Sequence, residues 1–93
     1  SGESEMTVNK DFVVRTVAGE TMLIPVGKNV LKYNGIFTLS ESGAMIYKLL
    51  CEGKADEEII AALNESFDAD EATLKNDFDE FIQQLKDAEI ILP

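Results

Sequence analysis

The stretch IFTLSESGAMIYKLL, residues 36–50, changes its hydrophobic period partway along. Ile36–Leu39 is rich in β-branched and aromatic residues, as in a short strand, whereas from Ser40 onward the apolar residues recur at helical spacing. Ser40 is a favourable N-cap, and Glu41 suits the positive end of a helix dipole. The stretch therefore predicts a strand that passes directly into a helix.

Upstream of this junction, the sequence predicts a hairpin. Phe12–Val17 and Glu20–Pro25 have the composition of strands, and Ala18-Gly19 between them fits a two-residue turn. Pro25 cannot donate a ladder hydrogen bond, so the second strand should end there or lie at an edge.

A second turn is expected at Asn34-Gly35, because this dipeptide readily takes positive φ angles. It predicts that Val30–Tyr33 forms a strand that pairs with Ile36–Leu39.

Downstream, three helices are expected. The first ends at Gly53, the second begins near Asp56, and the third begins near Asp70. The third has the strongest helical pattern, with apolar residues at Leu74, Phe78, Phe81, Ile82 and Leu85. The apolar end Ile90–Leu92 should dock on the core, because its exposure would be unfavourable. Strands followed by helices predict an α+β fold, with one domain over residues 10–93 after a flexible tail over residues 1–9.

The net charge is −10, with 18 acidic and 8 basic residues. Residues 1–50 hold five of each sign, whereas residues 51–93 hold thirteen acidic and three basic residues. Nucleic acid is therefore an unfavourable partner, because phosphate binding needs clustered Lys and Arg. The chain has no apolar run long enough to span a bilayer and no visible signal peptide, so we expect no membrane association and a cytoplasmic location.

The residues for common catalytic chemistry are scarce. The chain has no histidine, so a Ser-His pair and the usual zinc ligand are missing, and we expect no enzyme activity, metal or cofactor. Cys51 ends an apolar helical stripe and is interpreted as a core residue. Asp68, Asp70, Glu71 and Asp77 resemble a calcium loop only superficially, because the glycine at its sixth position is missing; helix capping by Asp70 is preferred.

A sheet of three or four short strands must leave at least one edge unpaired unless a helix covers it. Such an edge can bind an extended peptide by strand addition, with affinity from backbone hydrogen bonds and selectivity from side-chain pockets. Gly43 inside a helix is unfavourable, which indicates a close backbone approach, for instance by the sheet.

Two segments resemble the PqqD family. Leu39–Leu50, LSESGAMIYKLL, is similar to that family's signature at the start of its first helix, and Asp77–Ile91 resembles its closing helix and apolar tail. The resemblance implies a winged-helix-like fold of a three-stranded antiparallel sheet followed by three helices. It also implies a non-catalytic function: binding the leader of a ribosomally synthesised precursor peptide and presenting it to a modifying enzyme, such as a radical S-adenosylmethionine enzyme in pyrroloquinoline quinone synthesis.

In the family the leader pairs with the third strand and lies against the third helix. Carried onto this chain, the resemblance implies peptide contacts from Gly35, Ile36, Phe37, Thr38, Leu39, Lys75, Phe78, Asp79, Ile82 and Leu85. Glu89 departs from the family pattern, which often has a glycine just after the last helix, and this puts the docking of Ile90–Leu92 in question.

Two other readings stay open from the sequence. A DNA-binding winged helix would share the architecture, but Asp77, Asp79 and Glu80 on the third helix would repel phosphates. A structural module could instead form a homodimer through its open edge. The sequence leaves the precursor peptide, the enzyme and the pathway undetermined.

Overall fold

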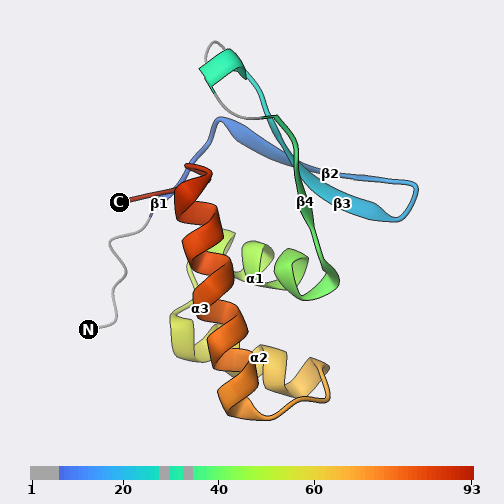
Figure 1. Cartoon of the computed structure of the whole chain (residues 1–93), viewed down its shortest axis with the longest axis vertical. Helices are drawn as coiled ribbons and strands as arrows, with labels where there is room; N and C mark the ends of the chain where they lie inside the picture. The colour runs from blue at the N-terminus through green and yellow to red at the C-terminus, as the bar shows by residue number, and fades with distance from the viewer. Residues whose placement is uncertain (1–6, 28–29, 33–34) are drawn as a thin grey trace.

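The computed structural model of the chain describes residues 7–27, 30–32 and 35–93. In chain order the elements are β1 (Thr7–Val8), β2 (Phe12–Val17), β3 (Glu20–Pro25), the 3-10 helix η1 (Val30–Lys32), β4 (Phe37–Leu39), α1 (Glu41–Cys51), α2 (Asp56–Ser66), α3 (Glu71–Asp87) and β5 (Ile91–Leu92). The sheet lies at one end of the molecule, and α3 extends from the helical end up to the start of β2 (Figure 1). The predicted α+β class, a three-stranded antiparallel sheet followed by three helices, is confirmed.

The main sheet has the order β2-β3-β4, and both of its pairings are antiparallel. The predicted turn between β2 and β3 is confirmed, since Ala18 and Gly19 both have positive φ, at 54° and 84°. These angles match the right-handed twist of the strands that the turn joins. β3 ends at Pro25, as expected from the missing N–H.

The strand predicted over Val30–Tyr33 is wrong for the described part of that range. Val30–Lys32 forms η1, and the N–H of Val30 donates to the carbonyl of Gly27 at 3.3 Å. β4 takes β3 as its partner instead, so the sheet does not need a strand before the turn. Of the predicted Asn34-Gly35 turn, Asn34 lies outside the described residues, and Gly35 has a φ of 93°.

The three helices begin where the sequence predicted. The Ser40 hydroxyl accepts from the Gly43 N–H at 3.1 Å and caps α1, while an Asp70 carboxylate oxygen accepts from the Thr73 N–H at 2.8 Å and caps α3. At the start of α2, the Ala55 N–H donates to the Glu58 carboxylate at 2.9 Å. Side chains thus satisfy backbone groups that a helix end leaves unpaired.

One core joins the sheet to the helices. Its buried apolar residues are Phe12, Leu23, Leu39, Ile46, Tyr47, Ile59, Leu63, Leu74, Phe78, Ile82, Leu85, Ile90 and Ile91. Each of the three helices contributes buried apolar residues at helical spacing. Within the described ranges, no helix combines the length and apolarity needed to cross a membrane.

The two ends of the described chain pair with each other. Thr7 and Val8 of β1 lie opposite Leu92 and Ile91 of β5 in a separate two-stranded sheet. The flexible tail predicted over residues 1–9 is therefore wrong for residues 7–9, while residues 1–6 lie outside the described part. β1 was not predicted, because two residues are too few for a visible hydrophobic period.

Glu89 ends α3 in the conformation that a glycine would normally supply. Its φ is 62°, its N–H donates to the Lys86 carbonyl at 3.0 Å, and the Ile90 N–H donates to the Leu85 carbonyl at 2.9 Å. This is a Schellman motif, completed by Leu85 and Ile90, both fully buried. The substitution of glutamate therefore leaves the helix end intact, and the docking of Ile90 and Ile91 is confirmed.

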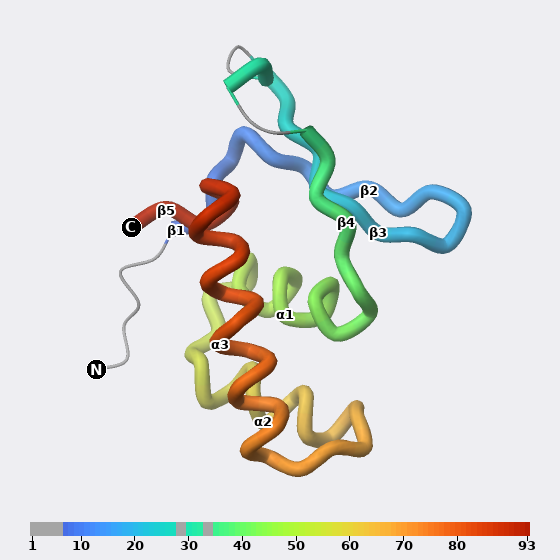
Figure 2. The backbone as a smooth tube through the Cα atoms, in the orientation of Figure 1, coloured from blue at the N-terminus to red at the C-terminus, as the bar shows by residue number. Residues whose placement is uncertain are grey.

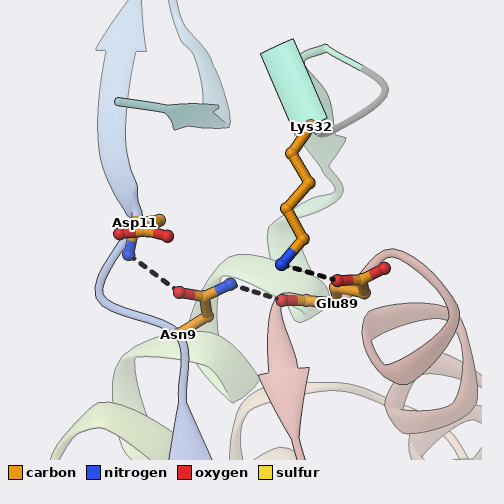
Figure 3. Close-up of polar contacts among 4 residues, drawn as sticks. All are labelled: Asn9, Asp11, Lys32 and Glu89. Atoms are coloured by element: carbon orange, nitrogen blue, oxygen red, sulfur yellow. Dashed lines mark hydrogen bonds and ion pairs between the residues drawn. The ribbon is translucent and has the colours of Figure 1, made fainter. Parts of the chain in front are cut away.

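Asn9 holds this turn from the other end of the chain (Figure 3). Its side-chain N–H donates to the Glu89 carbonyl at 2.8 Å, and its backbone N–H donates to the Ile90 carbonyl at 2.8 Å. Its side-chain oxygen accepts from the Asp11 N–H at 2.9 Å. Asn9 is buried, so these bonds also satisfy a polar group that would otherwise destabilise the core.

Replacing Glu89 by glycine should raise the free energy of unfolding by about 0.5–1 kcal/mol, because glycine takes a positive φ without strain at Cβ. The ion pair between Lys32 and Glu89 is 3.9 Å long and more than half exposed, so its loss offsets little. Chemical denaturation of both proteins measures the difference.

The control is Gly53→Ala, because Gly53 occupies the same position after α1, with a φ of 80°. That change should lower the free energy of unfolding by about 1 kcal/mol. A destabilised Glu89→Gly variant would show that the glutamate side chain contributes more than its backbone strain costs.

Candidate functional site

β4 is an edge strand of the sheet. It pairs with β3 on one side, and no described strand pairs with its other side. The strand is shorter than expected: Ile36, predicted as its first residue, precedes it and is 60% exposed. The positive φ of Gly35 is incompatible with an extended strand, so the strand cannot extend further toward the N-terminus than Ile36.

The hairpin turn determines which backbone groups each strand directs to its neighbours. In a two-residue hairpin, the residues that flank the turn form a hydrogen-bonded pair, here Val17 and Glu20, and such pairs then alternate along the ladder. At the far end the alternation predicts that Asp11 pairs with Val26, and the Val26 N–H indeed donates to the Asp11 carbonyl at 2.7 Å.

On β3, the same alternation turns the N–H and C=O groups of Thr21 and Leu23 toward β4. Their partners on β4 are Leu39 and Phe37. The residue between them, Thr38, must then point its own N–H and C=O away from β3, to the open edge. Among the described residues, no backbone bond outside the sheet involves Thr38.

β4 descends beside the C-terminal half of α3 toward the start of α1 (Figure 2). Two pockets lie along this side of α3, the larger between β4 and α3 and the smaller between the start of α1 and α3. The larger, of about 420 Å³, is lined by Phe12, Lys32, Gly35, Ile36, Phe37, Gln84, Asp87, Ala88, Glu89 and Ile90. The smaller, of about 230 Å³, is lined by Ser40, Ser42, Gly43, Ile46, Leu63, Leu74, Asp77, Glu80, Phe81 and Gln84. Gln84 lines both pockets, so the two pockets adjoin each other along α3. We name them together the β4–α3 groove.

An aromatic pair lies between the two pockets. The rings of Phe37 on β4 and Phe81 on α3 meet edge to face, with centroids 6.4 Å apart and planes at 64°. This geometry is favourable for two aromatic quadrupoles. Both side chains are only partly buried, so the pair supplies an apolar surface in the middle of the β4–α3 groove.

Gly43 lets Phe81 reach this position. A methyl group on Gly43 would lie 3.1 and 3.2 Å from two ring carbons of Phe81 and 3.2 Å from the Ser40 hydroxyl. The sequence correctly indicated a close approach at Gly43, but the expectation that the sheet makes it was wrong, because the approaching group is a side chain of α3.

The α3 residues predicted to contact a peptide fall into two groups. Phe78, Ile82 and Leu85 are 2%, 7% and 0% exposed, so they belong to the core beneath the groove. Lys75 and Asp79 are exposed, form an ion pair of 3.5 Å with each other, and do not line the groove; Lys75 lines a separate pocket between α2 and α3. Their contact with a peptide stays a prediction.

The α3 side chains that do line the groove were missed as site residues. They are Asp77, Glu80, Phe81, Gln84 and Asp87, together with the buried Leu74 and with Ala88 just after the helix. At about 100° per residue, Asp77, Phe81 and Gln84 lie on one flank of the buried stripe and Lys75 and Asp79 on the other, while Glu80 and Asp87 lie further round toward the exposed face. The sequence pattern located the stripe but carried no signal for which flank faces β4.

Two side chains outside the groove were also singled out from the sequence. Cys51 is exposed, so its interpretation as a core residue was wrong; it is the last residue of α1, where the buried stripe ends. Burial, together with the adjacent Cys51 thiol, raises the pKa of Tyr47. Asp70 caps α3 as expected, and the hydrogen bond from Thr73 holds the pKa of its carboxyl below the usual value. Among the described residues, no three His, Cys, Asp or Glu side chains gather as a metal site.

The fold and the edge define the class: a small α+β domain whose three-stranded sheet has β4 as an edge strand beside the last helix. The chain belongs to the PqqD family, described as Coenzyme PQQ synthesis protein D, whose sequence profile matches residues 20–91. No curated protein sequence matches the chain significantly.

Two solved structures are similar to this chain. One, described as "TbiB1 in Complex with the TbiA(beta) Leader Peptide", is 26% identical, with a TM-score of 0.75 over 90% of this chain and 92% of that chain. Another, described as "Lasso peptide synthetase B1 complexed with the leader peptide", is 16% identical, with a TM-score of 0.81 over 97% of this chain and all of that chain. At 16% identity, the similarity to the second structure shows a shared fold.

The contact between Gly43 and Phe81 is testable by a double-mutant cycle. Gly43→Ala alone should lower the free energy of unfolding by about 1 kcal/mol, because displacing a packed ring outweighs the gain in helix propensity. In a Phe81→Leu background, the same change should stabilise the protein by about 0.5–1 kcal/mol, since the clash is gone. Equal effects in the two backgrounds would contradict the contact.

Proposed function

We propose that this chain is a non-catalytic recognition domain that binds the leader of a ribosomally made precursor peptide as an additional strand on β4. The observation that carries the proposal is the outward-facing backbone of Thr38 at the open edge. Membership of the PqqD family supports it, as does the similarity to a solved structure described as a complex with a leader peptide.

Strand addition would use the groove as follows. The peptide backbone pairs with the N–H and C=O of Thr38, and alternate peptide side chains turn toward α3. Those side chains meet the Phe37–Phe81 pair and the two pockets on either side of it. Ile36, exposed at the edge of the larger pocket, adds apolar surface.

Backbone hydrogen bonds alone are too weak for micromolar binding, so leader side chains must contribute to the affinity. A backbone hydrogen bond contributes about 0.5–1.5 kcal/mol net, so the two groups of Thr38 supply about 1–3 kcal/mol. Micromolar binding needs about 8 kcal/mol, and burial of one apolar side chain supplies about 1.5–3 kcal/mol. Two or three apolar leader side chains must therefore enter the groove, and more if ordering the peptide is costly.

Within this proposal the predicted residues have different roles. Gly35, Ile36 and Phe37 line the groove, Thr38 pairs with the peptide, and Leu39 anchors β4 in the core. Phe78, Ile82 and Leu85 hold the groove wall from beneath. Lys75 and Asp79 form an exposed surface on the other flank of α3 and are available to a second protein.

We propose further that the bound leader delivers its precursor to a modifying enzyme, for example a radical S-adenosylmethionine enzyme, which supplies the chemistry. The composition of the chain supports a binding function, since it has no histidine and its single cysteine does not line the groove. Titration with candidate leader peptides from precursor genes tests the proposal: amide resonances of β4 and of the groove-lining residues of α3 should shift together.

Thr38→Pro should weaken leader binding about tenfold, because it removes the N–H that faces the peptide while the bonds of Phe37 and Leu39 to β3 remain. Isothermal titration calorimetry measures the affinity, and a thermal melt confirms that the variant stays folded. Thr38→Ala is the control: it keeps the N–H and should bind almost as the parent does.

Two outcomes would contradict strand addition at β4. One is equal affinity for the proline and alanine variants. The other is a stable homodimer, seen by light scattering, that persists at saturating leader peptide, because a second copy would then occupy the edge.

A further inference from the structure

The walls of the β4–α3 groove carry mainly negative charge. Four carboxylates line its two pockets, Asp77 and Glu80 in the smaller and Asp87 and Glu89 in the larger. Among the described lining residues, Lys32 is the only base, and it already pairs with Glu89 at 3.9 Å. An added strand must therefore lie beside three carboxylates that no described cation balances.

Two of these three carboxylates accept hydrogen bonds from neutral side chains. Glu80 accepts a hydrogen bond from the Asn76 side chain at 3.4 Å, and Asp87 accepts one from the Gln83 side chain at 3.0 Å. The nearby ion pair on α3 joins Lys75 to Asp79 on the opposite flank. The negative potential along the groove therefore stays available to a ligand.

The positions of the carboxylates match the repeat of an extended peptide. With a rise of about 1.5 Å per residue, the midpoint between Asp77 and Glu80 lies about 13 Å from Asp87 along α3. In an extended peptide, residues i and i+4 turn to the same side and lie about 13 Å apart. Residue i+2 falls halfway between them, beside Phe81 and Gln84.

We propose, building on the strand-addition function above, that the groove selects leaders with the pattern basic-x-apolar-x-basic. The two basic side chains face Asp77 with Glu80 at one end and Asp87 at the other, while the apolar side chain rests on the Phe37–Phe81 pair. The pattern is symmetric, so it holds whichever way the peptide runs along β4. A leader with acidic residues at these two positions is rejected by like charge.

Three synthetic peptides, each about 12 residues long to span the groove, test the proposal. They share a central leucine and differ only at the two flanking positions, which are both lysine, both glutamine or both glutamate. At low salt, the lysine peptide should bind about tenfold more tightly than the glutamine peptide, with each ion pair contributing up to about threefold. The glutamate peptide should bind most weakly, and the differences should shrink as salt is added.

Matched variants of the full chain test whether the groove carboxylates cause the difference in affinity between the peptides. The triple variant Asp77→Asn, Glu80→Gln, Asp87→Asn should bind the lysine peptide only as tightly as the parent binds the glutamine peptide. Glu71→Gln, which removes a carboxylate of the same helix beside the separate pocket between α2 and α3, should leave all three affinities unchanged.

Amide shifts of Phe37, Thr38 and Leu39, followed in the same titrations, distinguish a failure of charge selection from a failure of strand addition. Shifts at β4 with equal affinity for the three peptides, or with preference for the glutamate peptide, overturn the charge selection and leave strand addition intact. An absence of β4 shifts with every peptide at millimolar concentration overturns strand addition itself, and the selection with it.

Discussion

The central constraint on this structure is that, among the described strands, β4 has a partner on one side only. A backbone N–H or C=O that has no partner favours either water or another chain, and Thr38 presents both groups at the edge. The two ends of the described chain pair with each other as β1 and β5 and not with β4. Asn9 and the turn at Glu89 hold that pairing in place.

The groove beside the edge depends on a few small or strained positions. Gly43 leaves the space that brings the Phe81 ring up to Phe37, so α1, α3 and β4 meet around one aromatic pair. The left-handed turn at Glu89 ends α3 at the level of β4 and sends Ile90 and Ile91 into the core. Packing contacts far from the edge thus determine which side chains an added strand would meet.

The sequence predicted the features that depend on local rules. The caps at Ser40 and Asp70, the Ala18-Gly19 turn and the core stripe of α3 follow from neighbours a few residues away. Features that depend on distant contacts were missed. Among them are the pairing of β1 with β5, the capture of β4 by β3 in place of Val30–Tyr33, and the flank of α3 that faces the sheet. The family resemblance pointed to β4 and α3, but only the packing showed that Phe78 and Leu85 lie beneath the groove wall and Phe81 at its surface.

Amide hydrogen exchange at three consecutive residues of β4 tests the central claim most directly, because each amide reports whether its own N–H is bonded. In the free protein, the Thr38 amide should exchange much faster than those of Phe37 and Leu39, and saturation with a leader peptide should slow it to their rate. A Thr38 amide that is already as protected as its two neighbours in the free protein would contradict the open edge and the function built on it.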